Sequence, residues 1–245
     1  MVNKFTIYGE RCTGTNYLES LMVNNFDVSV TWDYGWKHFF GWHSLNNSDD
    51  TLFIGIVRNP VDWLNSFYKT PHHLPPHLQP KLLHPKWKNN IKLQAIAHNI
   101  NAYNFLNKEF YSVHHDNPKE NIEDRNMYTK KRYTNIFEMR HTKLKFLMKD
   151  MPNKVKHYIL IKYEDLMHNF EATMKRIQAA GQLTIKPDIL SSSSFPKNIY
   201  TYKGIKNGNE YSKDTNSISK PLPPRKILNH PKFVKTFEKQ LGYVK

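Results

Sequence analysis

The stretch that decides the fold is KFTIYGERCTGTNYL, residues 4–18. It begins as a short apolar run with β-branched and aromatic residues, which is typical of a strand, and it breaks at Gly9. After a turn that ends at Gly14, apolar residues recur at spacings of three and four, which predicts a helix over roughly residues 15–25. A strand, a glycine-bearing turn and a helix in this order aim successive N–H groups at one point. The stretch therefore predicts an anion-binding loop.

The loop offers backbone N–H groups, two threonine hydroxyls and a guanidinium. Its candidate binding residues are Arg11, Cys12, Thr13, Gly14, Thr15 and Asn16. The spacing Gly9-x4-Gly14 is that of a nucleotide P-loop, but Thr15 and Asn16 stand where a P-loop NTPase has Lys and Ser/Thr. We therefore expect a site for a phosphate-like group that lacks the ATP-specific lysine and metal ligand. A plain tight turn is the alternative interpretation.

Length and composition bound the class of protein. A chain of 245 residues, 39% hydrophobic and 13% aromatic, is typical of one folded α/β domain. Its 36 Lys and Arg against 21 Asp and Glu give a formal charge of +15, which favours an anionic partner: a nucleotide, nucleic acid, an acidic glycan or a membrane surface. The single cysteine excludes an internal disulfide framework and a Cys-based zinc cluster. With no signal peptide and no apolar run that could span a bilayer, we expect a soluble, cytoplasmic protein.

A second motif surrounds the continuous apolar run Thr51–Val57, which predicts a central parallel strand. Arg58 follows this strand, where a P-loop NTPase has an aspartate for Mg²⁺. Pro60 is expected to begin a helix with Asp62 in its first turn, and Ser66 lies eight residues after Arg58. Because open α/β sheets bind ligands at the carboxyl ends of their strands, Arg58 is a candidate ligand-binding residue. A surface pair between Arg58 and Asp62 is the alternative.

These two motifs, with the run ILIKYEDL at Ile159–Leu166, resemble the PAPS-dependent sulfotransferases. In that family a strand, loop and helix near the N-terminus hold the 5′-phosphosulfate. A strand that ends Val-Arg-Asn-Pro, with a serine further on, holds the 3′-phosphate, and a later strand ends Tyr-Glu-Asp-Leu. The resemblance covers about residues 4–68 and 156–181. It implies one domain over residues 1–245, a three-layer α/β sandwich with a central parallel sheet and the P-loop-NTPase-like sulfotransferase fold, in which residues 69–155 form the acceptor side.

The resemblance also implies the cosubstrate and its binding residues. The cosubstrate would be PAPS and the product 3′,5′-ADP, with no metal required. The residues of the first loop would contact the 5′-phosphosulfate, Arg58 and Ser66 would hold the 3′-phosphate, and Tyr163 would contact adenine. Lys203 and Gly204 belong to a segment similar to the Lys-Gly motif of the family and join the cofactor-binding set.

The candidate catalytic residues are His38, Lys37 and Arg11. Sulfuryl transfer needs a base for the acceptor hydroxyl and cations for the developing charge. An unperturbed histidine titrates near ~6.5, so His38 is the preferred base. The rival bases are Glu10, His43, His72 and His73.

The rest of the chain is predicted more coarsely. We expect a second strand at Val28–Trp32, followed by Trp36–Phe40, and a strand that ends in Tyr-Glu-Asp-Leu. Helices are predicted over Asn90–Phe110, Tyr133–Lys149, Asn169–Ala180 and Asn229–Leu241. The Pro- and His-rich segment 70–87 is interpreted as a loop over the acceptor pocket, because its histidine spacing fits no zinc template. Residues 114–132 are predicted to be a surface insertion, and residues 220–225 a loop. Basic residues of 133–149 are expected on a solvated face or in a groove for an anionic acceptor.

The predicted activity is transfer of a sulfuryl group from PAPS to a hydroxyl of a glycan, including an anionic one, or of a small polar acceptor. One alternative is a P-loop kinase or NTPase. The other is a non-catalytic protein that binds polyanions or nucleic acid, although no nucleic-acid-binding fold signature is visible and no nucleic-acid partner is expected. The sequence does not specify the oligomeric state.

Overall fold

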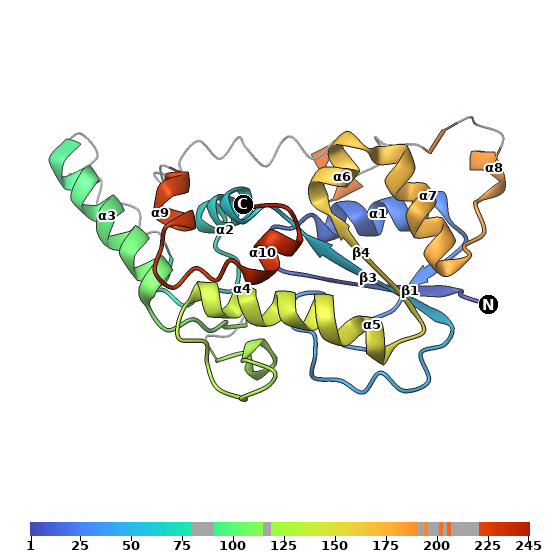
Figure 1. Ribbon diagram of the computed structural model, residues 1–245, viewed down its shortest axis with the longest axis horizontal. Coiled ribbons are helices and arrows are strands. Elements are labelled where there is room, and N and C mark those ends of the chain that lie inside the picture. The colour runs from blue at the N-terminus through green and yellow to red at the C-terminus, as the bar shows by residue number, and fades with distance from the viewer. Residues whose placement is uncertain (80–90, 115–118, 191–193, 196–200, 203–204, 207–220) are drawn as a thin grey trace. The chain divides into compact units, whose positions relative to one another are not determined.

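The computed structural model describes residues 1–79, 91–114, 119–190, 194–195, 201–202, 205–206 and 221–245 (Figure 1). The chain divides into two compact units. The first contains residues 1–59 and 145–213, and the second contains residues 60–144 and 214–245. The prediction that the whole chain acts as one domain stays a prediction.

The first unit is built on a four-stranded parallel sheet in the order β2-β1-β3-β4. The strands are β1 (Lys4–Gly9), β2 (Ser29–Val30), β3 (Thr51–Val57) and β4 (His157–Lys162). All seven residues of β3, which pairs on both sides, are buried. The α/β class with a central parallel sheet, predicted from the sequence, is confirmed. Because the strands run in parallel, their carboxyl ends lie along one edge.

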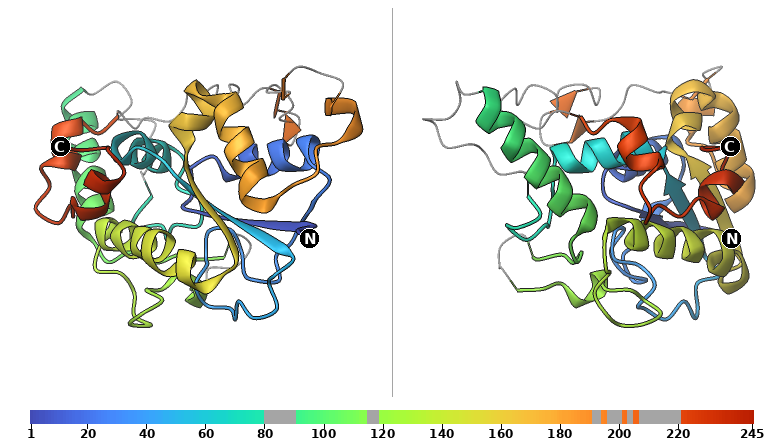
Figure 2. Two further views of the ribbon diagram at one scale, coloured as in Figure 1. Left: turned by 45° about the vertical axis from the view of Figure 1, so that its right-hand side comes forward. Right: turned by 60° about the vertical axis from the view of Figure 1, so that its left-hand side comes forward.

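One face of this sheet packs against helices. Alternate side chains of the strands, among them Phe5, Ile7 and Ile54, join one core with three helices. These are α1 (Thr15–Asn25), α6 (Tyr163–His168) and α7 (Phe170–Gly181), and Figure 2 shows α1 and α7 on the same side of the strands. After α7 the chain forms the short helix α8 (Pro187–Leu190). A short antiparallel pair of strands follows, β5 (Thr201–Tyr202) with β6 (Ile205–Lys206).

The opposite face packs against an aromatic layer. The ring of Tyr8 in β1 stacks on Phe40, with centroids 5.0 Å apart, and Phe40 stacks on Phe146 at 5.7 Å. Phe146 begins a π-helical turn, η3 (Phe146–Asp150), which continues into α5 (Met151–Lys154). Phe40, from the segment of residues 31–50, thus packs between β1 and the π-helical turn on this face.

The second unit is mainly helical. Its elements are α2 (Pro60–Lys69), α3 (Ile91–Asn107), η2 (Ile122–Asp124), α4 (Ile136–Lys145, with its last residue in the first unit), α9 (Pro224–Leu228) and α10 (Thr236–Gln240). The ring of Phe67 packs against Phe105 and Phe110 at 5.8 and 6.0 Å. None of the helices among the described residues of the chain combines the length and the apolar character needed to cross a bilayer.

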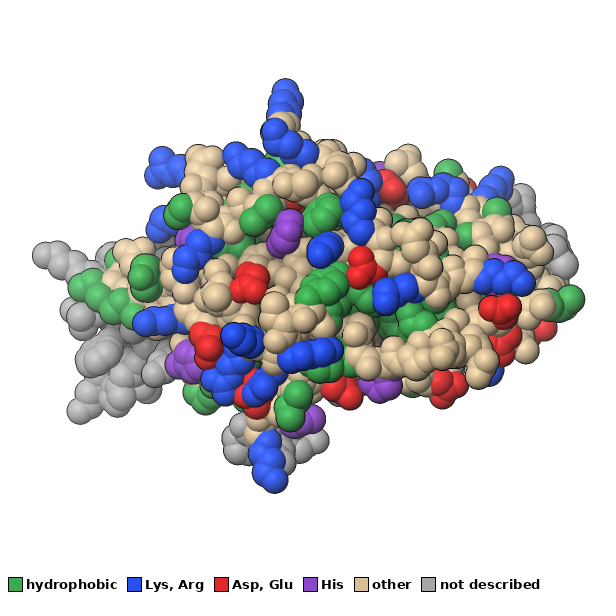
Figure 3. Space-filling view, turned by 60° about the horizontal axis from the view of Figure 1, so that its bottom comes forward, with side chains coloured by type: hydrophobic (Ala, Val, Ile, Leu, Met, Phe, Trp, Pro, Cys, Tyr) green, Lys and Arg blue, Asp and Glu red, His purple; other side chains and the backbone are tan. Residues whose placement is uncertain are grey.

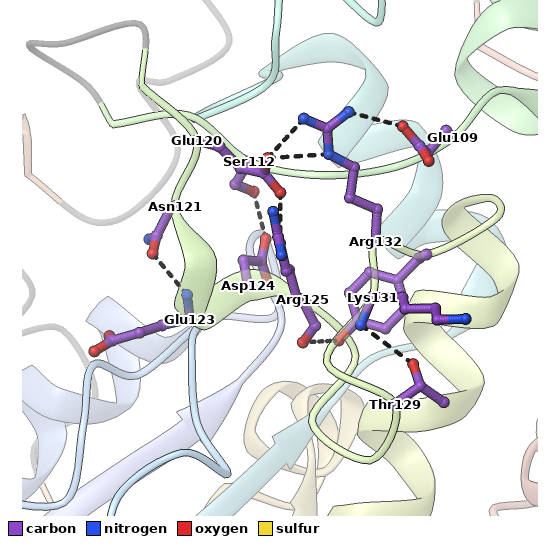
Figure 4. A network of polar contacts seen from close by, with 11 residues as sticks. Glu109, Ser112, Glu120, Asn121, Glu123, Asp124, Arg125, Thr129, Lys131 and Arg132 are labelled. Carbon is purple, nitrogen blue, oxygen red and sulfur yellow. Dashed lines mark hydrogen bonds and ion pairs between the residues drawn. The ribbon is translucent and has the colours of Figure 1, made fainter.

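Charges of both signs are interspersed on the face in Figure 3, where Lys and Arg side chains lie among Asp and Glu side chains. Figure 4 shows one such network in the second unit, centred on Glu120. Arg132 and Arg125 donate to its two oxygens, at 2.6 and 2.8 Å, and these hydrogen bonds lower the pKa of Glu120 to about 2. Arg132 also pairs with Glu109 at 2.9 Å.

Two ion pairs of the second unit are buried, and they correct two predictions. Arg140 pairs with Glu238 at 2.5 and 3.0 Å, and Lys143 pairs with Asp124 at 2.5 Å, all four with side chains no more than 3% exposed. The basic residues Arg140 and Lys143 are therefore not on a solvated face or in a groove. Residues 114–132 are not only a surface insertion, because Asp124 is fully buried where Lys143 and Ser112 bind it.

Several predicted elements have different boundaries, each for a local reason. The expected second strand is limited to β2, and Trp36–Phe40 forms turns, since Gly35 and Gly41 with φ of 101° and 92° interrupt extended backbone on both sides. The strand β4 ends at Lys162, and the Tyr-Glu-Asp-Leu run is helical in α6, where its carboxylates suit a helix N-terminus. The predicted helix over Asn229–Leu241 is interrupted near Pro231, and α9 begins inside the predicted loop 220–225. The predicted Tyr133–Lys149 helix is α4 followed by the π-helical turn.

Candidate functional site

The phosphate loop, defined here as residues 10–16, connects β1 to α1 by a tight turn. Gly14 has a φ of 94° and Cys12 a φ of 66°, so two left-handed residues turn the chain into the helix. The first backbone bond into α1 runs from Leu18 N–H to Gly14 O at 3.0 Å. By helix geometry, the preceding N–H groups of the first turn point outward from the N-terminus, which carries a partial positive charge.

Threonine hydroxyls contribute unequally to this loop. Thr13 is fully buried, and both its N–H and its hydroxyl donate to Glu10 O, at 3.3 and 2.7 Å. Thr13 thereby holds the turn. Thr15 is 4% exposed and begins α1. Arg11 is also buried, with its guanidinium 5.5 Å from the ring centroid of Phe39. Its positive charge makes the electrostatic potential at the loop more positive.

Arg58 and Tyr163 meet this loop at the carboxyl edge of the sheet. Arg58 follows β3, and its Nη1 donates to Cys12 O at 3.1 Å. Tyr163 follows β4, and the centroid of its ring lies 4.7 Å from Cζ of the Arg58 guanidinium, which stacks over it. The same ring covers Gly14: a Cβ there would lie 2.5 Å from Cδ2 and 2.8 Å from Cε2 of Tyr163. Residues from the ends of three adjacent strands therefore form one continuous surface.

His38 and Lys37 approach the loop from the side of β2. The carbonyl of Lys37 accepts from Gly9 N–H at 3.0 Å, and His38 Nδ1 lies 2.8 Å from Gly9 O, so this segment is fastened to the end of β1. Because a carbonyl oxygen only accepts, Nδ1 carries the proton in this contact, and the lone pair of the neutral ring is on Nε2. Lys37 Nζ donates to Asn16 Oδ1 and pairs with Glu19 at 3.1 Å.

The remaining predicted site residues lie either in the second unit or outside the described residues, so the structure describes no contact between them and the phosphate loop. Ser66 lies in α2 of the second unit and is half-buried. His72 and His73 lie in the turn segment after α2, also in that unit. Lys203 and Gly204 lie outside the described residues, as does the segment 80–90 of the proposed acceptor loop. Their roles stay predictions.

The two other rival bases belong to the first unit. Glu10 begins the phosphate loop and is 2% exposed, which places its carboxyl group in the interior. His43 is exposed, with Nδ1 2.7 Å from where a Cβ on Gly35 would lie. His38 is bound to the end of β1 through its contact with Gly9 O.

Three contributing residues were missed from the sequence. Glu19 fixes the ammonium of Lys37, and Glu164 Oε1 accepts from Asn59 N–H at 2.8 Å, next to Arg58. Burial raises the pKa of Tyr17, and nearby Tyr163 adds to the shift. Glu19 could have been found from the sequence, because it lies three residues after Asn16 and therefore on the same face of the helix. The other two depend on contacts between distant segments.

The surface as a whole suits an anion. Arg58 and the helix N-terminus offer N–H donors around Gly14, whose lack of a side chain admits the close approach of a ligand or of Tyr163. Among the described residues of the chain, no three His, Cys, Asp or Glu side chains gather in a geometry that could hold a metal ion. Arginine and backbone N–H groups at a helix N-terminus are donors of the kind that bind phosphate groups.

Comparison with known proteins gives limited information. No protein-family model matches the chain, and no curated protein matches it in sequence. Among solved structures, it is similar to the crystal structure of mouse sulfotransferase SULT7A1 complexed with PAP, with 13% sequence identity and a TM-score of 0.39. That match covers 98% of this chain and 82% of the mouse chain. So distant a likeness says nothing about the chemistry of this chain.

Proposed function

We propose that the protein is a PAPS-dependent sulfotransferase that transfers a sulfuryl group to a hydroxyl of a glycan or small polar acceptor. The observation that carries the proposal is the meeting of the phosphate loop, Arg58 and Tyr163 at one edge of the sheet. PAPS has phosphate groups at both the 5′ and the 3′ position, so it needs two separate sites for anions. The loop supplies one, and Arg58, at the end of the neighbouring strand, supplies the other.

The residues of the two sites have distinct tasks. When bound, PAPS would supply the sulfuryl group and a good leaving group, 3′,5′-ADP. The N–H groups at the start of α1 would then orient the 5′ end and stabilise the charge that develops there. Arg58 can bind Cys12 O and a phosphate together because a guanidinium has five N–H donors. Tyr163 holds the guanidinium in place from below.

His38 would act as the base. With its Nδ1 proton directed to Gly9 O, its Nε2 can accept the proton of an acceptor hydroxyl. The ammonium of Lys37 is held beside the loop by Asn16 and Glu19, so this positive charge has a fixed position. The attack would then need only alignment and charge stabilisation, both of which a fixed arrangement supplies.

Calorimetric titration tests the proposal with three ligands. We expect 3′,5′-ADP to bind without metal, and both 5′-ADP and ATP with Mg²⁺ to bind at least about tenfold more weakly, since a tenfold change is about 1.4 kcal/mol and one charged hydrogen bond contributes about that. The isomers 3′,5′-ADP and 5′-ADP differ only in the position of one phosphate. Equal affinity for both, or preference for Mg²⁺-ATP, would refute the assignment and favour the kinase alternative.

A further inference from the structure

Two tryptophans lie together on the segment that carries His38. The ring centroids of Trp32 and Trp36 are 4.8 Å apart, and Trp36 is 42% exposed. The ammonium of Lys37 lies 5.5 Å from the Trp32 centroid and 5.2 Å from that of Trp36. Since Lys37 is itself bound to Asn16 and Glu19 of α1, the pair of rings is fastened to the start of that helix.

Backbone turns fix the same rings. Gly35 N–H donates to Trp32 O at 3.0 Å, and Phe39 N–H donates to Trp36 O at 2.9 Å. Between them the chain turns at Gly35, with a φ of 101°. These bonds restrict the backbone of Trp36, and the contacts with Trp32 and Lys37 restrict its ring. Such restriction before a ligand arrives lowers the entropy that binding must overcome.

A single exposed aromatic side chain is ordinary on a protein surface. Trp36 differs from Tyr103 in that its ring contacts Lys37 and Trp32, on the segment that carries the candidate base His38. A flat indole matches the apolar C–H face of a sugar ring. The hydroxyls around that ring need polar partners, and the same segment exposes Asp33, His43 and Asn46. A phenolic acceptor would instead favour an enclosed apolar pocket.

We propose that Trp36, supported by Trp32, is the acceptor platform of the site and that the acceptor is a sugar ring stacked on it. This inference rests on the proposed function, because it names the acceptor class for the same site. Trp36 and His38 are two residues apart, at most about 7 Å along the chain, and on this proposal a ring stacked on Trp36 would present a hydroxyl to His38. The hydroxyl oxygen forms the new bond to sulfur, its proton passes to Nε2, and the bond from sulfur to the 5′-phosphate oxygen breaks, releasing 3′,5′-ADP.

Nuclear magnetic resonance of the full chain, saturated with 3′,5′-ADP, tests this proposal. The five tryptophans give five indole N–H signals, and Trp36→Phe identifies the one that belongs to Trp36. The probes are diacetylchitobiose as a neutral sugar, a heparin-derived disaccharide as an acidic one, and 4-nitrophenol as the phenolic competitor. We expect at least one saccharide to shift the Trp36 signal, and Trp36→Ala to weaken its binding at least tenfold.

The variants separate the platform from the fold. Trp36→Phe, which keeps an aromatic face, should retain most of the affinity for the sugar, and 3′,5′-ADP should bind all Trp36 variants as it binds the wild type. Tyr103→Ala is the matched control, since Tyr103 is an exposed aromatic residue of the second unit, 60% accessible. It should change nothing.

Four results would overturn the proposal. They are no saccharide binding, a shift with 4-nitrophenol alone, unchanged sugar affinity in Trp36→Ala, and sugar binding by a wild-type chain that does not bind 3′,5′-ADP. The last result would refute the sulfotransferase itself, and the titration with 3′,5′-ADP before any sugar is added tells it apart from the other three.

Discussion

Replacing Gly14 by alanine tests whether the phosphate loop and Tyr163 pack as described. Two costs combine at this position. Left-handed backbone costs a non-glycine residue about 1–2 kcal/mol. The new Cβ, 2.5 Å from Tyr163 Cδ2, must also displace the ring, and such overpacking costs about 1–3 kcal/mol. A stiffer unfolded chain offsets about 0.4–1 kcal/mol of these costs, so the expected loss of stability is about 1–5 kcal/mol.

Gly242 provides the matched control. Its φ is 75°, but a Cβ there meets nothing within 4 Å. Gly242→Ala therefore carries the backbone cost alone and should lose about 1 kcal/mol. The difference between the two variants, measured by urea denaturation and circular dichroism, reports the contact with the Tyr163 ring.

A double-mutant cycle isolates that contact. In a Tyr163→Ala background, Gly14→Ala should cost no more than Gly242→Ala, because the ring is gone. The affinity for 3′,5′-ADP should fall about tenfold in Gly14→Ala, since a displaced ring no longer supports Arg58. If Gly14→Ala costs the same with and without Tyr163, the packing of the ring on the loop is refuted.

Three further predictions address the site and the second unit. Arg58→Ala should weaken 3′,5′-ADP binding at least about tenfold and Arg58→Lys less, by calorimetry; unchanged affinity in a folded variant would remove Arg58 from the 3′-phosphate site. His38→Ala should spare nucleotide binding but reduce sulfuryl transfer to the bound saccharide about 100-fold or more, whereas His43→Ala should not; the reverse result would make His43 the base. Glu120 has a pKa lowered from 4.5 to about 2, so its ion pairs stabilise the fold above pH 4.5 and lose that effect as the pH falls toward 2; Glu120→Gln should lower stability at neutral pH and flatten the acid-induced loss in that range, and an unchanged profile would contradict the network.

The parts of the site that could be predicted from the sequence are local ones. Gly9 and Gly14 mark the turn between an apolar strand and a helix, and α1 has the predicted bounds. The same holds for β3 and the start of α2, where seven apolar or small residues are followed by Arg58 and a proline that suits the first helical position. In each case neighbouring residues determine the backbone conformation, so the sequence pattern is sufficient to predict the strand, the turn and the helix.

The convergence of the site is not local. Tyr163 reaches Gly14 because β4 pairs with β3, and β3 with β1, in parallel register. No pattern within residues 157–163 specifies that partner. The sequence therefore indicated which residues follow strands, and the shared carboxyl edge explains why they meet, but the stacking of Tyr163 under Arg58 depends on packing alone.

In residues 31–50 the sequence pattern and the structure differ for a local reason. The prediction of extended backbone at Val28–Trp32 and then at Trp36–Phe40 implies that Lys37 and His38 point to opposite faces. Two glycines with positive φ break the extended backbone, and the aromatic rings fill the layer beneath β1 instead of a strand face. With the two-residue period gone, adjacent side chains are free to converge. Lys37 contacts Asn16 of the phosphate loop, and His38 contacts Gly9 at the end of β1, directly before that loop. The turn that departs from the predicted strand thus brings a cation to the phosphate loop and the candidate base to the strand end directly before it.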